Sequence, residues 1–385
     1  MRHLFPVVLL LVVSAAVAAP TVIVNGNPVT IPVMDVGGKA FIDVVALMQL
    51  LGGKATYDAG AGKLYINSTG APAGGGAPVK LADFGTPQLP GDNGQVGQVY
   101  KLRNSSPLYF RLNSAEYTVS QVRFGAAAVI PQAAEKLLVL HFSVQNPQNV
   151  EALLRFDQLK FTAVDAMDVN HEAKSMLGDE QTQGDLSMRL KPAQRIEGYA
   201  CIVVPAKGVI PKLMVMSPLT NDGPILRYDL RDRVAPLPAP IADPTDPSGA
   251  TALEVVPAQL NAPYSLGRFD VTVEKVETVT TALDAAAPPN GGSYFVVTVL
   301  CKNKMGIDLL LRFDTLSPTL TDVDGQHLKF RNLLAATANS VFSQPVASGA
   351  EVRVRFYFTV PKDAKLKSLA IKEATSRTYE YDVSQ

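Results

Sequence analysis

Several residue types are scarce in this sequence of 385 residues: tryptophan is absent, and there are only two cysteines and four histidines. Without tryptophan the chain lacks the strongest stacking platform for a sugar ring and keeps only tyrosine and phenylalanine. The chain also has no net charge, because lysine plus arginine and aspartate plus glutamate number 35 each. No run of basic residues gathers on one face, as nucleic-acid binding requires. We therefore expect no nucleic-acid partner.

The residues that are present are typical of folded domains. Apolar residues make up 47% of the chain and charged residues 18%, and these proportions argue against disorder. The length favours two or three domains.

Residues 1–18 are predicted to be a cleaved secretion signal. Arg2 and His3 give a short positive start to an apolar run, and Ala16-Val17-Ala18 supplies the small residues that a signal peptidase reads. The alternative is an uncleaved anchor, but the apolar stretch is shorter than the roughly 20 residues that span a bilayer. No second hydrophobic span follows, so we expect no membrane span after cleavage. The predicted location is secreted, periplasmic or at the cell envelope.

A long internal repeat organises the rest of the chain. The segment Leu-Leu-Arg-Phe-Asp at 153–157 recurs 157 positions later at 310–314. The flanks repeat in the same order, namely 137–146 with 294–303 and Val204-Pro205 with Val360-Pro361. Two copies of one strand-rich unit behind a secretion signal predict a modular extracytoplasmic protein.

Cys201 and Cys301 fall in different copies of this repeat. Strand alternation places them on opposite faces of their strands, with Cys301 on the inward face. A disulfide needs Cα atoms within about 7 Å, which separate cores do not readily provide. We expect two unpaired thiols, Cys301 acting as a small buried hydrophobe.

Residues 20–67 form a first compact unit. Strands are expected at 21–24 and 29–33 around an Asn-Gly turn, a helix after Asp43, and a hairpin from 54–57 and 63–66. The ordered motifs Val24-Asn25-Gly26, Leu50-Leu51-Gly52, Thr56-Tyr57-Asp58 and Leu64-Tyr65-Ile66 resemble the copper amine oxidase N-terminal-like domain. That resemblance implies a small, non-catalytic α+β module of secreted and wall-associated bacterial proteins.

Two linkers separate the remaining parts. Residues 68–94 are rich in Gly, Pro and Ala and are predicted to be flexible, whereas the five prolines within 235–250 favour an extended, semi-rigid geometry. The first repeat copy then occupies 95–234 and the second 251–385.

Within each copy, alternating apolar and polar residues predict short strands, and Asp-Gly pairs such as Asp324-Gly325 predict hairpin turns. This pattern fits an immunoglobulin-like β-sandwich, although the Cys…Trp…Cys core of antibody domains is absent. The order strand–Asn, Leu-rich Phe-Asp segment, Asp-Gly hairpin and closing Val-Pro resembles a family of secreted bacterial immunoglobulin-like modules of unknown function. The second copy fits that family better than the first. The predicted fold class is mainly β: the α+β module followed by two sandwiches.

The sequence contains no catalytic, cofactor-binding or metal-binding constellation. His141, His171 and His327 are too scattered for a spaced metal set, and Thr378-Tyr379-Glu380-Tyr381 lacks the asparagine of the amine oxidase cofactor motif. Two acidic stretches are expected to be solvated hairpin turns instead of calcium loops. They are Asp168, Asn170 and Glu172 in the first copy, and Asp322 and Asp324 in the second.

The repeated Arg-Phe-Asp, at 155–157 and 312–314, is open to two interpretations. It is a recognition motif, or it is a strand whose Phe fills the core while Arg and Asp flank it. The second is favoured, because duplicated modules retain packing determinants. The sequence as a whole predicts a non-enzymatic envelope protein that binds or scaffolds a protein or polysaccharide. The alternative is an extracytoplasmic enzyme or accessory subunit with a site at a domain junction.

Overall fold

The computed structural model describes the backbone of six short strands between residues 22 and 67, together with residues 93–219 and 223–384. The chain divides into two compact units, Met1–Leu81 and Ala82–Gln385. In the first unit the described strands form three antiparallel hairpins. These strands are β1 (Val22–Val24), β2 (Asn27–Val29), β3 (Val33–Val36), β4 (Lys39–Ile42), β5 (Lys54–Asp58) and β6 (Lys63–Asn67).

The predicted hairpin near residues 54–66 is confirmed by the pairing of β5 with β6. Of the strand expected at 29–33, Val29 lies at the end of β2 and Val33 at the start of β3, and residues 30–32 lie outside the described residues. Val24 pairs directly with Asn27, so the loop is tighter than the expected three-residue turn. The signal, the helix expected after Asp43 and linker residues 68–92 lie outside the described residues.

The first repeat copy is built from strands that form two sheets and two separate strand pairs. The strands are β7 (Asn93–Gly94), β8 (Tyr100–Lys101), β9 (Tyr109–Thr118), β10 (Val122–Phe124), β11 (Ala127–Val129), β12 (Glu135–Gln145), β13 (Ala152–Leu154), β14 (Lys160–Val164), β15 (Asn170–Glu172), β16 (Gly178–Asp179), β17 (Met188–Leu190), β18 (Arg195–Pro205), β19 (Lys212–Met216), β20 (Leu226–Asp229) and β21 (Val234–Ala235), with the short helix η1 (Phe156–Gln158). One sheet has the order β16-β18-β12-β9-β21 with β8 beside β9, and the other has β15-β14-β19-β20-β7. The separate pairs are β10–β11 and β13–β17.

Aromatic side chains fill the space between these two sheets. Phe110, Phe142 and Phe161 come from β9, β12 and β14, and their ring centroids lie 5.4 to 6.0 Å apart. All three side chains are buried, because alternation along each strand turns one face toward the core. The first copy is therefore a β-sandwich.

The second copy repeats this arrangement. Its elements are β22 (Val255–Ala258), β23 (Pro263–Ser265), β24 (Phe269–Val279), η2 (Pro289–Gly291), β25 (Ser293–Asn303), β26 (Leu309–Leu311), β27 (Ser317–Asp322), β28 (His327–Leu328), β29 (Phe330–Ala335), β30 (Gln344–Val346), β31 (Glu351–Val360), β32 (Leu366–Lys372) and β33 (Thr378–Asp382). One sheet has the order β23-β24-β25-β31-β29, the other β22-β33-β32-β27-β28, and β26 pairs with β30.

The strand pairing shows that the sequence repeat is a structural repeat. Strands β9, β12 and β18 of the first copy correspond to β24, β25 and β31, and β14, β19 and β20 correspond to β27, β32 and β33. In both copies the opening strand (β7 or β22) runs parallel to the last strand of its sheet. The fold is mainly β, with two immunoglobulin-like sandwiches, as predicted. Val204 and Val360 are both buried in their respective cores, also as predicted.

Both cysteines are unpaired and buried. Cys301 lies in the core between the sheets of the second sandwich. Cys201 faces outward from its sheet into a small cluster beneath the β10–β11 hairpin, with Phe124 and Tyr199. The expectation of two free thiols on opposite strand faces is confirmed, and burial raises the pKa of each to about 12.

The proline-rich segment 235–250 is not the extended spacer that its composition predicts. It folds back on the first sandwich, where Leu237 and Ala250 enter the core. The Leu237 amide donates to the Gly249 carbonyl (3.0 Å), and Ile241 packs against the cores of both sandwiches. Buried apolar side chains outweigh the backbone preference of the prolines, because each removes apolar surface from water.

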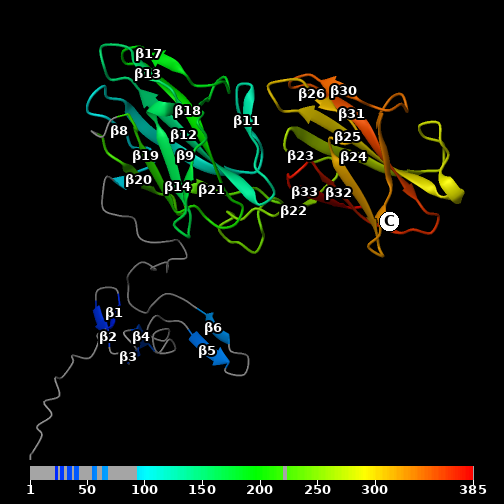
Figure 1. Ribbon diagram of the computed structural model, residues 1–385, viewed down its shortest axis with the longest axis horizontal. Coiled ribbons are helices and arrows are strands. Elements are labelled where there is room, and N and C mark those ends of the chain that lie inside the picture. The colour runs from blue at the N-terminus through cyan, green and yellow to red at the C-terminus, as the bar shows by residue number, and fades with distance from the viewer. Residues whose placement is uncertain are drawn as a thin grey trace, which may run out of the picture. The chain divides into compact units, whose positions relative to one another are not determined.

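Polar contacts join the two sandwiches directly. The buried Arg377, next to β33, donates from its guanidinium to the carbonyls of Ala133 (2.9 Å) and Glu135 (2.6 Å) in the first sandwich. The Ala133 amide in turn donates to the Thr375 carbonyl (3.0 Å). Figure 1 shows the β10–β11 hairpin reaching from the first sandwich toward the second. Within the described residues, no helix is long and apolar enough to cross a membrane.

Candidate functional site

The repeated Arg-Phe-Asp segment lies at the surface in both sandwiches. Phe156 is 48% exposed and Phe313 is 53% exposed. The prediction that these rings fill the cores is therefore wrong. The core positions of the segment belong instead to Leu154 and Leu311, which are fully buried.

A turn after the strand accounts for this difference. Leu154 ends β13, and the chain then turns through η1, where the Gln158 amide donates to the Arg155 carbonyl (2.9 Å). In the second sandwich the Thr315 amide donates in the same way to the Arg312 carbonyl (3.0 Å). Strand alternation stops at this turn, so the Phe that would have pointed inward points outward.

Two further apolar positions of the repeat are exposed in both copies. We call Val150, Leu153 and Phe156 triplet 1, and their equivalents Ile307, Leu310 and Phe313 triplet 2. The six side chains are between 37% and 57% exposed. Scattered exposed hydrophobic residues are common, but here the same three positions within seven residues remain large and apolar in both copies. Core packing does not explain that retention, so we treat the triplets as a candidate interaction surface.

A buried asparagine holds the loop that carries each triplet. The Asn146 side-chain amide donates to the carbonyls of Val150 (2.8 Å) and Leu190 (2.9 Å). Asn303 donates to the carbonyls of Ile307 (2.8 Å) and Val346 (2.9 Å). Each asparagine thus ties the first residue of its triplet to the strand that pairs with β13 or β26. The triplets are presented by fixed loops, because buried polar groups with satisfied hydrogen bonds rigidify their surroundings.

Charged residues of both signs surround each triplet. In triplet 1 the Arg155 guanidinium donates to the Asp157 carboxylate (2.7 Å), and in triplet 2 Arg312 pairs with Asp314 (2.6 Å). An acidic residue also follows the first triplet position in each copy, Glu151 or Asp308. Each triplet is therefore an apolar centre with charged side chains of both signs beside it.

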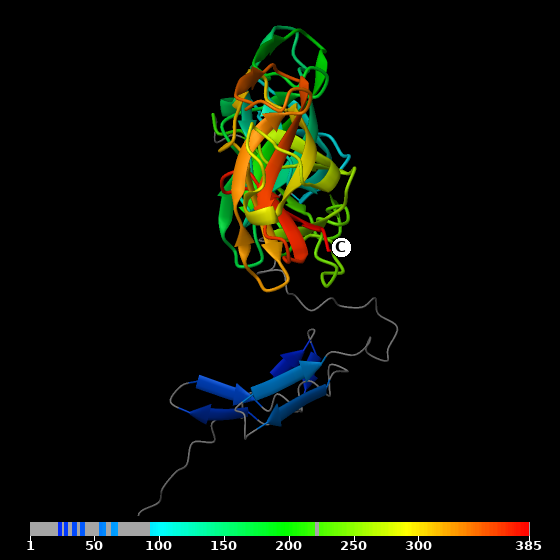
Figure 2. The same cartoon turned by 90° about the vertical axis from the view of Figure 1, so that its right-hand side faces the viewer.

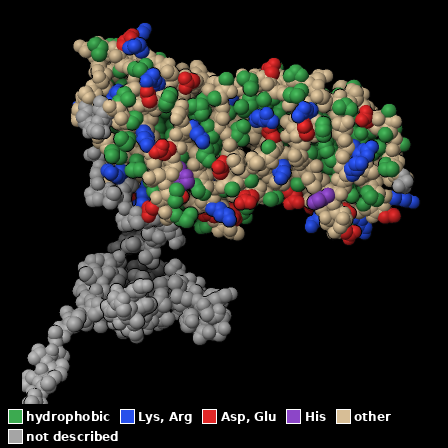
Figure 3. Space-filling model, in the orientation of Figure 1, with side chains coloured by type: hydrophobic (Ala, Val, Ile, Leu, Met, Phe, Trp, Pro, Cys, Tyr) green, Lys and Arg blue, Asp and Glu red, His purple; other side chains and the backbone are tan. Residues whose placement is uncertain are grey.

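The triplets lie along one edge of the second unit. The β13–β17 and β26–β30 pairs occupy the same edge in Figure 1 and stay together at that end after the 90° turn of Figure 2. Over the face shown in Figure 3, acidic and basic side chains are interspersed without a patch of one sign. The strand pairs next to the two triplets therefore lie along the same edge.

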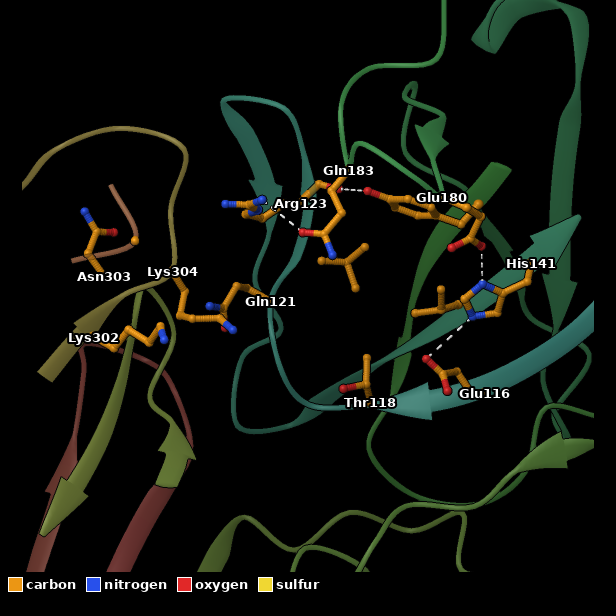
Figure 4. A pocket seen from close by; sticks show the side chains of 14 residues that line it. Glu116, Thr118, Gln121, Arg123, His141, Glu180, Gln183, Lys302, Asn303 and Lys304 are labelled. Atoms are coloured by element: carbon orange, nitrogen blue, oxygen red, sulfur yellow. Dashed lines mark hydrogen bonds and ion pairs between the residues drawn. The ribbon is translucent and has the colours of Figure 1, made fainter. Parts of the chain in front are cut away.

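A separate cleft of about 390 Å³ lies at the junction of the two sandwiches. Its lining comes from β9, β12 and β18 of the first sandwich, from β10, from the segment after β16 that carries Glu180 and Gln183, and from the end of β25 with the residues beyond it. Figure 4 shows His141 between Glu116 and Glu180 on one side, with Lys302 and Lys304 on the other side beyond Gln121. The sequence did not reveal this cluster, because its members are far apart along the chain.

The polar side chains on the His141 side of the cleft contact one another. His141 Nδ1 contacts the Glu180 carboxylate, and Nε2 lies 3.6 Å from Glu116. The imidazole separates the two carboxylates, so they do not converge on one metal position. The Tyr199 hydroxyl donates to the Arg123 carbonyl, and burial raises the pKa of Tyr199 to about 12. These donors and acceptors thus already have protein partners, whereas the buried side-chain nitrogen of Gln121, which also lines the cleft, has none among the described residues.

The other two histidines lie elsewhere. His171 Nε2 is 2.9 Å from the Asp165 carboxylate, and His327 Nδ1 is 3.2 Å from the Thr321 hydroxyl. The structure does not bring the three histidines together. Across residues 93–219 and 223–384 there is no group of three His, Cys, Asp or Glu side chains placed to hold a metal ion.

Both acidic stretches belong to hairpins; Asp168 and Asp324 lie in the turns, as expected, whereas Asn170 and Glu172 lie in strand β15. The Asp165 carboxylate accepts from the amides of Met167 and Val169 (2.9 Å each), and Asp322 accepts from those of Asp324 (3.1 Å) and Gln326 (2.8 Å). In the first copy Asp168 pairs with Lys212 (2.7 Å) and Glu172 with Lys160 (2.6 Å). The tyrosines of the terminal strand, Tyr379 and Tyr381, are buried core residues.

Comparison with known proteins agrees with this description of the second sandwich. Residues 258–380 match a family described as a domain of unknown function (DUF4352). The resemblance of the second copy to a family of unknown function is thereby supported. No curated protein matches the chain.

Among solved structures the chain is similar to an uncharacterised β-sandwich protein from Clostridium difficile 630. The identity is 14%, the match covers 38% of this chain and 97% of that one, and the TM-score is 0.29. The sandwich assignment itself rests on the strand pairing of this chain.

Proposed function

We propose that this is a secreted, non-enzymatic modular protein that binds or scaffolds a protein partner at the cell envelope. The observation that supports this proposal most is that the same three apolar positions are exposed in both sandwiches. In each sandwich a buried asparagine holds the loop that carries them. An apolar centre with a charged rim has the anatomy of a protein–protein interface. The predicted signal and the resemblance of residues 20–67 to the copper amine oxidase N-terminal-like domain support the extracytoplasmic location and a non-catalytic first module.

The test is a pull-down from envelope extracts with the exported protein, in which protein and polysaccharide fractions are analysed separately. We expect specific protein recovery with the wild-type chain and loss of it with the double variant Phe156→Ser, Phe313→Ser. Met167→Ser is the matched control, because Met167 is an exposed apolar residue outside both triplets. Equal recovery with wild-type and double variant would contradict the proposal.

A second candidate is an extracytoplasmic enzyme or accessory subunit with a site at the sandwich junction. The observation in its favour is the cleft, where Glu116 and Glu180 flank His141. It is the weaker candidate, because both histidine nitrogens face carboxylates. A screen of envelope-derived small molecules by thermal unfolding tests it. A ligand that stabilises wild-type protein but not Glu180→Gln would favour this candidate.

A further inference from the structure

The triplets raise the question of which partner fits two similar surfaces at a fixed separation. The inference below rests on the proposed function and names the partner. We propose that the partner is a second copy of this chain, and that the two copies form a dimer through both triplets at once.

The size of one triplet argues that the two act together. Half-exposed side chains of this kind offer roughly 250 Å² of apolar surface per triplet, given about 150–250 Å² for a whole large side chain. A stable interface buries about 800 Å² per partner. One triplet falls well short of that area, whereas two triplets with their charged rims approach it.

The fixed separation of the triplets restricts the partner further. Arg377 and Ile241 join the sandwiches, so the distance between the triplets is set by packing instead of by a flexible linker. A partner that engages both sites needs two matching sites at the same distance, otherwise the gain from bivalency is lost. A second copy has that distance automatically. A two-fold axis then brings each triplet onto a triplet of the other copy.

The charges beside the triplets also suit a second copy. Each triplet has arginine (Arg155 or Arg312) and carboxylate side chains beside it, so it offers both signs to a facing surface. In a two-fold pair, the arginine of one copy faces a surface that contains carboxylates.

The experiment is sedimentation velocity of the full exported chain from low micromolar to several hundred micromolar concentrations. We expect reversible dimerisation of the wild-type protein and of Met167→Ser. Phe156→Ser and Phe313→Ser should each weaken it at least tenfold, and the double variant should remain monomeric. Circular dichroism and the melting temperature check that every variant is folded; Phe156→Leu and Phe313→Leu, which keep apolar contact, should largely restore association.

Two results would overturn the dimer. One is a wild-type chain that stays monomeric at every concentration; the proposed function then survives if the envelope pull-down still depends on both triplets. The other is a dimer that persists unchanged in the folded double variant, which would place the interface elsewhere. Loss of both dimerisation and triplet-dependent recovery would remove the proposed function as well.

Discussion

Asn146 and Asn303 show how one buried residue defines the repeated surface. Each side-chain amide donates to the first triplet residue and to the neighbouring strand, and each side-chain oxygen accepts from the backbone two residues on, at Gln148 (3.0 Å) or Met305 (2.8 Å). Both asparagines are fully buried. The two loops are therefore held by the same set of hydrogen bonds. Both the nitrogen and the oxygen of each buried asparagine side chain have partners, so neither is left unsatisfied.

Leu311 and Phe313 lie two residues apart, but we expect their truncation to lower the free energy of unfolding by different amounts. Leu311→Ala should cost about 2–5 kcal/mol, because Leu311 is fully buried. Phe313→Ala should cost about 1 kcal/mol or less, since its ring is already half in water. Chemical denaturation of both variants measures the difference. A larger loss for Phe313→Ala would mean that its ring lies in the core after all.

Lys136 gives the first sandwich a pH dependence. Its ammonium group is buried, donates to the carbonyls of Gly208 and Ala250, and lies 4.4 Å from the Tyr117 ring centroid. Burial lowers the pKa of Lys136 to about 7 from its ordinary 10.5. Between these values the unfolded chain binds a proton that the folded chain lacks, so stability should rise with pH by at most about 1.4 kcal/mol per unit.

Urea unfolding at pH 7, 8 and 9 tests that rise. Lys136→Met removes the titrating group, so its stability should be flatter with pH than that of the wild-type protein. Identical slopes for the two proteins would show that Lys136 does not carry the effect.

At the scale of elements, the β10–β11 hairpin links several features of the molecule. It covers Cys201, lines the cleft, and its turn contacts the loop of triplet 2. A Cβ added at Gly306 would lie 2.6 Å from the Gly125 carbonyl oxygen and 3.1 Å from the Ala126 Cα. These are backbone atoms, so the hairpin or the triplet loop would have to move.

Gly306→Ala should therefore expose Cys201. In the wild-type protein both thiols should react slowly with an aromatic disulfide reagent at neutral pH, because they are buried and their pKa values are raised to about 12. The substitution should accelerate one thiol, and Cys201→Ser should abolish that faster phase. Unchanged reactivity in Gly306→Ala would show that the hairpin does not depend on this contact.

The sequence predicted the strands better than it predicted which of the neighbouring side chains are buried or exposed. Alternation and Asp-Gly turns indicated the strands of both sandwiches, because burial on one face leaves a period-two pattern. The same alternation placed Phe156 and Phe313 in the cores, and it failed there because a three-residue turn interrupts the strand. Proline content likewise suggested an extended linker, although Leu237, Ile241 and Ala250 anchor it by burial. The cleft around His141 left no local pattern, since its residues meet only through folding.

At the scale of the whole molecule, the two sandwiches behave as one body because Arg377 and the folded segment 235–250 join them. Arg377→Ala would leave buried carbonyls without a donor and should cost about 2–4 kcal/mol at the junction. We expect calorimetry to show one main transition for the sandwiches of the wild-type protein and two for the variant. Arg353→Ala, which breaks an exposed pair with Glu274 (2.6 Å), is the control and should keep one. A single transition in Arg377→Ala would contradict this coupling.

The central claim is that the repeat presents two exposed apolar triplets that a partner covers together. Hydroxyl-radical footprinting of the exported protein, read by mass spectrometry at Phe156 and Phe313, tests it most directly. The account predicts that both rings are oxidised in dilute protein and that both become protected in parallel as the protein is concentrated or mixed with its envelope partner. Rings that resist oxidation in dilute protein, or that stay equally reactive under every condition, would contradict it.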